Sequence, residues 1–173
     1  HTLPDSVKKD AMYIIWEDFE DFEVLDPGKG IEKQRLAVCV TNAHADYFNN
    51  FLVKYRKGEQ VVKFDGTIYD AFGKQVKKLK NSEIRDYSSV SDFSLYEDDR
   101  VKYAEITHNQ YPYTVVYEYE KKVEGLYNYP VKIFQRHRKA YVLSSVLQFT
   151  LPETMSLKYK EFNLNNIVSV NSN

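Results

Sequence analysis

One short stretch, YPYTVVYEYEKKV at residues 111–123, constrains the fold more than any other part of the chain. With the two-residue period of a β-strand, alternate residues from Tyr113 to Tyr119 fall on one face, and Glu118 and Glu120 fall on the other. A sandwich strand with one buried face has this pattern. We therefore predict that the row Tyr113, Val115, Tyr117, Tyr119 is core; the alternative is an exposed platform on which sugars or bases stack.

The rest of the chain favours the same class of structure. Fifteen Tyr and ten Phe accompany many Val and Ile residues, which suit a pleated sheet. Residues 31–42, 100–106 and 140–153 alternate, and turn signals at Asp65-Gly66 and Phe72-Gly73-Lys74 indicate a meander of antiparallel strands. We predict an all-β, antiparallel sandwich of roughly 9–11 strands.

The N-terminal region allows two interpretations. Residues 12–26 fit either an alternating strand or a helix with one apolar stripe, and we favour the strand because β-branched and aromatic residues open the segment. The turn residues 26–30 that follow are of the kind that joins strands. Residues 4–6 offer a helix N-cap, so a short N-terminal helix is also allowed.

Length and charge narrow the classes of function. The 173 residues suit one domain, 1–173. The 24 Lys and Arg nearly cancel the 25 Asp and Glu, which argues against a nucleic-acid partner. No apolar run approaches the roughly 20 residues of a membrane span. We expect no nucleic-acid binding and no membrane-spanning segment.

Residues for catalysis or metal binding are scarce. The acids within residues 17–23 and 97–99 could hold Ca²⁺, but they match no EF-hand loop, and we interpret them as solvated polar faces. One Cys and four His cannot form a closed zinc site of the usual kind, and Cys39, between two Val residues, is predicted to be a small buried residue. The chain also has no G-x-S-x-G motif and no Gly-rich phosphate loop. We expect no catalytic residue, metal or cofactor in this chain.

Three ordered motifs carry a resemblance to a known family. They are GTIYDAFGK at 66–74, DDRVK at 98–102 and YPYTVVYEYE at 111–120. Together they resemble the uncharacterised β domain that precedes a transglutaminase-like core in secreted proteins of the Bacteroidetes. Val116 departs from the pattern, which usually has an acid there.

The resemblance implies a role and a place for the chain. It implies an N-terminal accessory module of a longer polypeptide, located in the periplasm or outside the cell after removal of a signal peptide. The catalytic Cys, His and Asp would then belong to the downstream transglutaminase-like domain, which would also be the partner of this one.

Two hypotheses about function follow. In the first, the chain is a non-catalytic structural or docking module that presents an apolar patch to its neighbour. In the second, it is a binding module for a carbohydrate or a peptide, with aromatic rings forming a groove. Tyr111, which precedes a proline at the entry to a strand, is the ring expected near the surface. The candidate ligand-binding residues are Trp16, Tyr87, Phe93, Tyr96 and Tyr111.

Overall fold

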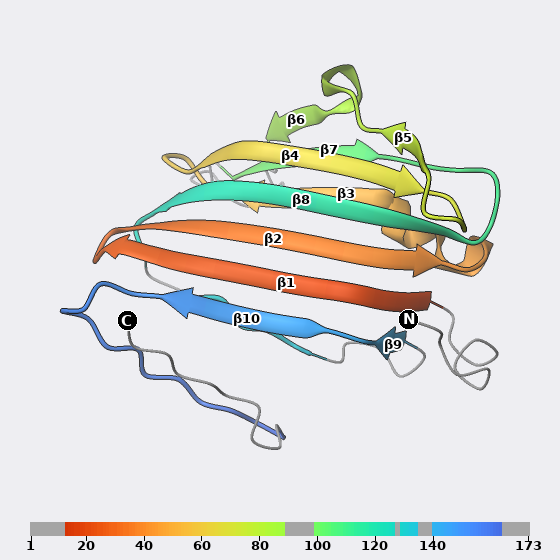
Figure 1. The fold of residues 1–173 in the computed structure, drawn as a ribbon. Coiled ribbons are helices and arrows are strands. Elements are labelled where there is room, and N and C mark those ends of the chain that lie inside the picture. The colour runs from red at the N-terminus through yellow and green to blue at the C-terminus, as the bar shows by residue number, and fades with distance from the viewer. Residues whose placement is uncertain (1–12, 89–98, 127–128, 135–139, 164–173) are drawn as a thin grey trace, which may run out of the picture.

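The fold is known from a computed structural model that describes residues 13–88, 99–126, 129–134 and 140–163. In this part of the chain a larger sheet has the strand order β10-β1-β2-β8-β4-β5, and β9 also pairs with β1 (Figure 1). Its strands are β1 (Tyr13–Asp26), β2 (Lys29–Val40), β4 (Gln60–Tyr69), β5 (Gln75–Lys78), β8 (Tyr113–Glu124), β9 (Ala140–Val142) and β10 (Ser145–Thr150).

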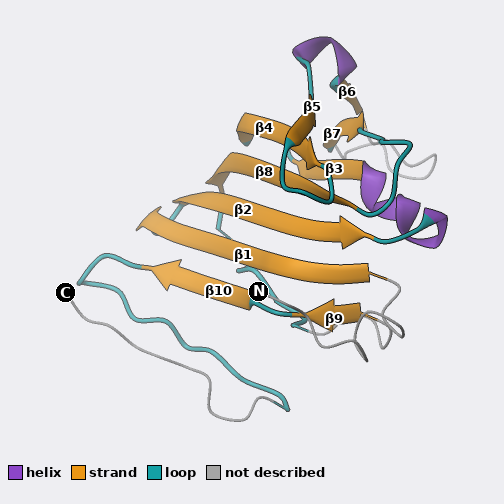
Figure 2. Cartoon of the chain, turned by 45° about the vertical axis from the view of Figure 1, so that its right-hand side comes forward, coloured by secondary structure: helices purple, strands orange, loops and turns teal. Residues whose placement is uncertain are grey.

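A smaller sheet covers part of the larger one. Its order is β3-β7-β6, and Figure 2 shows it beside β4 and β8, away from β1 and β10. Its strands are β3 (Asn50–Tyr55), β6 (Arg85–Ser88) and β7 (Arg100–Glu105), and two short 3-10 helices are η1 (Ala43–Asn49) and η2 (Asn81–Glu83). The predicted all-β class is confirmed, and the two sheets pack as an unequal sandwich. The N-terminal helix allowed by the sequence lies outside the described residues.

The core lies where the two sheets face each other. Tyr113, Val115 and Tyr117 of β8 are at most 2% exposed, as the alternation predicted. From the smaller sheet, Phe51 stacks on Phe64 with ring centroids 4.3 Å apart and on Tyr117 with centroids 4.4 Å apart. Buried aromatic and aliphatic side chains from both sheets therefore share one apolar cluster.

The predicted meander is confirmed at only one of its two turns. Phe72-Gly73-Lys74 lies in the turn that joins the antiparallel pair β4 and β5, but Asp65-Gly66 lies inside β4. Although β3 and β4 are consecutive, β3 pairs with β7 in the smaller sheet, and β4 pairs with β8 and β5 in the larger sheet. At the opposite edge, β9 and β10 run parallel to β1. Local alternation cannot reveal either feature, because it fixes which face a residue occupies and not which strand lies beside it. Among the described residues no helix is long and apolar enough to cross a membrane.

The β1–β2 hairpin offers a direct test of close packing. A Cβ atom on Gly30 would lie 2.9 Å from the Glu23 carbonyl oxygen, which is backbone and cannot swing away. Gly30→Ala is therefore expected to lower the free energy of unfolding by about 1–3 kcal/mol in chemical denaturation. At Gly28 a Cβ would meet only Asp26 Oδ1, at 3.5 Å. Equal losses for Gly28→Ala and Gly30→Ala would contradict this account.

Candidate functional site

The sequence-predicted ligand-binding residues lie on separate elements. Trp16 is half-buried at a β-bulge of β1 in the larger sheet, and Tyr87 is 47% exposed on β6 in the smaller sheet. Phe93 and Tyr96 lie outside the described residues. A part in ligand binding stays a prediction for all four of these residues.

Tyr111 lies near the surface, as predicted, with 40% of its area exposed. Its hydroxyl donates to the Asp46 carboxylate at 2.8 Å, and its ring stacks on Tyr113 with centroids 5.5 Å apart. Tyr113 in turn donates to Asn49 Oδ1 at 2.7 Å. These contacts tie the entry of β8 to η1, so Tyr111 has a structural role whether or not it meets a ligand.

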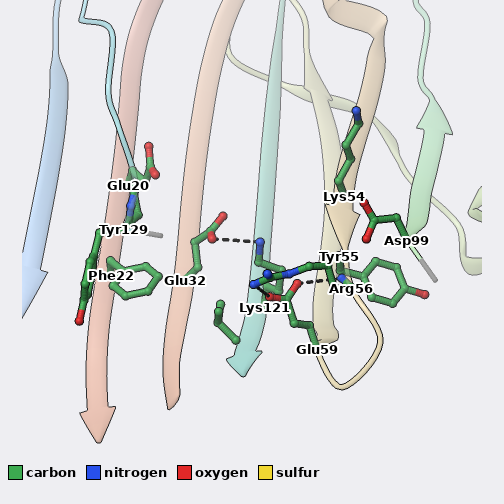
Figure 3. A pocket seen from close by; sticks show the side chains of 12 residues that line it. Glu20, Phe22, Glu32, Lys54, Tyr55, Arg56, Glu59, Asp99, Lys121 and Tyr129 are labelled. Carbon is green, nitrogen blue, oxygen red and sulfur yellow. Dashed lines mark hydrogen bonds and ion pairs between the residues drawn. The ribbon is translucent and has the colours of Figure 1, made fainter. Parts of the chain in front are cut away.

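A groove opens on the inner face of the larger sheet, beyond the end of the smaller sheet (Figure 3). Its volume is about 340 Å³, within the range of small-ligand sites. The floor comes from β1, β2 and β8, one wall from the β3–β4 turn, and the other wall from residues 129–130. The lining residues are Glu20, Phe22, Glu32, Lys54, Tyr55, Arg56, Glu59, Asp99, Lys121, Val123, Tyr129 and Pro130.

A buried ion cluster lies beside the groove. Lys132 Nζ lies 2.8 Å from Asp18 Oδ1 and 3.5 Å from Glu20 Oε2, and the Lys132 side chain is only 1% exposed. Burial raises the pKa of the Glu20 carboxyl, although the nearby Lys132 ammonium acts in the opposite direction. The interpretation of residues 17–23 as a solvated face is therefore wrong for Asp18 and Glu20, whose side chains are 13% and 14% exposed.

Further charge pairs line the groove itself. Lys121 Nζ lies 3.0 Å from Glu32 Oε2, and Glu32 also accepts a hydrogen bond from the Tyr119 hydroxyl. In the β3–β4 turn, Glu59 accepts bonds from the Arg56 backbone N–H at 2.8 Å and from its guanidinium at 3.0 Å. Figure 3 marks both pairs with dashed lines, one between neighbouring strands of the floor and one within the β3–β4 turn. The carboxylates of Glu20, Glu32 and Glu59 thus each have a cationic partner.

The remaining chemistry of the described residues is limited. None of their His, Cys, Asp and Glu side chains form a group of three that could hold a metal ion. Burial raises the pKa of the Cys39 thiol, which keeps it protonated near neutral pH. Paired charges and aromatic rings are the groups that line the groove.

Sequence reasoning did not find this groove. Its lining residues are brought together from six separate segments of the chain, a juxtaposition that only the strand pairing creates. The sequence holds one indication of this site. Lys121 continues the alternating row from Tyr113 to Tyr119, which predicts a charged side chain on the buried face of the strand. Such a residue needs a partner across the sheet, and Glu32 is directly opposite on β2.

Comparison with known proteins identifies the family. Residues 26–172 match the family DUF3857, described as a domain of unknown function with solved structure. This chain belongs to the DUF3857 family. No curated protein matches the sequence.

A solved structure contains the same fold. The DUF3857 chain is similar to part of a "putative protease" from Parabacteroides distasonis, with a TM-score of 0.69 at 11% sequence identity. The match covers 83% of this chain but only 29% of that protein, so this chain spans less than a third of its length. A "putative nutrient binding protein" from Legionella pneumophila matches over 66% of this chain and 40% of its own, with a TM-score of 0.33 and 11% identity. The first match shows a shared fold, and in the Parabacteroides protein the matching unit is one part of a longer chain.

Proposed function

We propose that this DUF3857 domain is a non-catalytic module that docks against a neighbouring domain of the same polypeptide. The neighbour we propose is transglutaminase-like, as the resemblance of the three sequence motifs implies. Support for a modular role comes from the Parabacteroides protein, in which the similar unit occupies 29% of the chain. The observation that carries the docking proposal is a group of exposed apolar side chains in the C-terminal part of the described chain.

These side chains gather on the C-terminal part of the described chain. We call them the apolar edge: Val131, Ile133, Tyr141, Leu143, Val146, Tyr159 and Phe162, which are between 36% and 85% exposed. Figures 1 and 2 both show their segments on the β10 side of the larger sheet, away from the smaller sheet. Exposed apolar side chains gathered on one side of a domain are typical of an interaction surface.

The backbone explains why these side chains point outward. Lys132 is turned inward to Asp18 and Glu20, so its neighbours Val131 and Ile133 point away from the sheet and are 85% and 57% exposed. Tyr159 and Phe162 lie in a segment without regular secondary structure and are 59% and 71% exposed. A contact with another domain would remove all four side chains from water, which is favourable.

Mutation of the apolar edge tests docking. The domain and the transglutaminase-like domain of its parent polypeptide, produced separately, are expected to associate, and Val131→Asp or Phe162→Asp should weaken the complex at least roughly tenfold in a titration. Phe72→Asp is the matched control, because Phe72 is 95% exposed but lies at the β4–β5 turn on the opposite side of the sheet. Docking is refuted if the two domains do not associate, or if all three variants bind alike.

We also propose that the domain works in the periplasm or outside the cell. The support is the resemblance to secreted proteins, in which a signal peptide has been removed. Fractionation of cells that produce the parent polypeptide should find it outside the cytoplasm, and recovery only in the cytoplasm would contradict this placement.

A further inference from the structure

We propose that the groove of Figure 3 is a carbohydrate-binding site that takes a short neutral oligosaccharide. This site is separate from the proposed docking surface, since none of the apolar-edge residues line the groove. Three observations carry this inference: the charges of the lining residues nearly balance, the strands of the floor are paired on both sides, and a partly exposed aromatic ring lines one wall.

The charge balance of the lining disfavours a strongly charged ligand. Two lining cations pair with lining carboxylates, Lys121 with Glu32 and Arg56 with Glu59, and Lys132 lies against Glu20. Lys54 lies on the outward face of β3, as Leu52 does. A phosphate or polyanion site would need an excess of cations. A neutral ligand meets no net repulsion here.

Sugar hydroxyls match the polar groups that the groove presents. Each hydroxyl both donates and accepts hydrogen bonds, whereas a carboxylate only accepts and an ammonium only donates. Lys121 Nζ lies 3.0 Å from Glu32 Oε2, and the Arg56 guanidinium lies 3.0 Å from Glu59 Oε1, as the dashed lines in Figure 3 mark. A donor beside an acceptor can satisfy two adjacent hydroxyls of one sugar ring.

The floor of the groove disfavours an extended peptide. A peptide that binds by strand addition needs a sheet edge with unpaired backbone N–H and C=O groups. The floor strands are interior: β1 lies between β2 and β10, β2 between β1 and β8, and β8 between β2 and β4. Recognition must therefore come from side chains, which suits a sugar.

An aromatic ring stands at the wall where a sugar would lie. Tyr129 is 39% exposed and meets the buried Phe22 ring edge-on, with centroids 5.9 Å apart. Phe22 thereby holds the Tyr129 ring in place while part of it remains open to the groove. A fixed, partly exposed ring gives the apolar face of a sugar a surface on which to pack.

An array that carries neutral oligosaccharides, acidic oligosaccharides and peptides tests the proposal with the purified 173-residue chain. A neutral oligosaccharide is expected to bind, and Tyr129→Ala and Arg56→Ala should each weaken its binding roughly tenfold in calorimetric titration. Arg56 is exposed, so Arg56→Ala leaves the fold intact even if Tyr129→Ala does not, and thermal unfolding checks both. Tyr159→Ala and Lys158→Ala are the controls, because neither residue lines the groove.

Several results would overturn this inference. They are binding of acidic oligosaccharides or peptides alone, no binding of any neutral oligosaccharide at millimolar concentration, and a neutral ligand that both groove variants bind unchanged. Tyr159→Ala alters the apolar edge and leaves the groove unchanged. The variants therefore test the sugar site and the docking surface separately.

Discussion

Phe51→Ala is expected to lower the free energy of unfolding by about 3–5 kcal/mol. Phe51 is 7% exposed, and its ring lies between Phe64 and Tyr117, at centroid distances of 4.3 and 4.4 Å. Because Phe51 belongs to β3 while the other two rings belong to β4 and β8, this stack joins the two sheets. Its removal leaves a cavity at the interface that holds the sandwich together.

The next residue of the same strand is the matched control. Leu52 is 48% exposed on the other face of β3, so Leu52→Ala should cost less than about 0.5 kcal/mol. Urea unfolding of both variants measures the difference. If Phe51→Ala unfolds at nearly the wild-type midpoint, the two sheets do not depend on this stack.

Lys132→Ala is expected to lower the free energy of unfolding by about 3 kcal/mol or more. The loss of the ammonium leaves Asp18 and Glu20 against each other on an inner face where their side chains are 13% and 14% exposed. Breaking a buried pair costs more than its net attraction is worth, because the remaining charges stay buried without compensation. The same variant should release residues 129–134, which then exchange backbone hydrogens faster.

A surface ion pair between β1 and β2 provides the comparison. Lys33 and Glu23 lie 3.9 Å apart with side chains 42% and 38% exposed, so Lys33→Ala should change stability by less than about 1 kcal/mol. Denaturation of both variants at the same pH tests the contrast. Similar small losses would mean that the Lys132 cluster is solvated and that it does not anchor the segment.

Much of the fold could be predicted from local alternation. The two-residue period of residues 113–119 placed three of four side chains in the fully buried core, with Tyr119 partly buried against it. A proline-constrained entry placed Tyr111 at the surface, where it is 40% exposed. The first prediction concerns one face of a single strand, for which the side-chain period is sufficient. The second depends on the proline that follows Tyr111, just before β8 begins.

Strand order and burial of charge could not be predicted in the same way. The parallel pairing of β10 with β1 joins residues more than a hundred positions apart, and alternation alone carries no information about such partners. Asp18 and Glu20 resemble a solvated face in the sequence because their compensating cation, Lys132, lies in a distant segment without regular secondary structure. The groove is likewise a product of long-range pairing.

The segment 129–134 links the two proposed surfaces. Lys132 anchors it to the larger sheet, Tyr129 forms a wall of the groove, and Val131 and Ile133 face outward as part of the apolar edge. A ligand in the groove would therefore contact the same short segment that a neighbouring domain covers.

Docking is the central claim, and hydrogen–deuterium exchange tests it most directly. Exchange would be compared between the isolated domain and the same domain joined to its transglutaminase-like neighbour. We expect protection to increase in residues 140–162, with little change in β5 and β6 on the far side of the molecule. Unchanged exchange in residues 140–162, or protection confined to the smaller sheet, would contradict docking through the apolar edge.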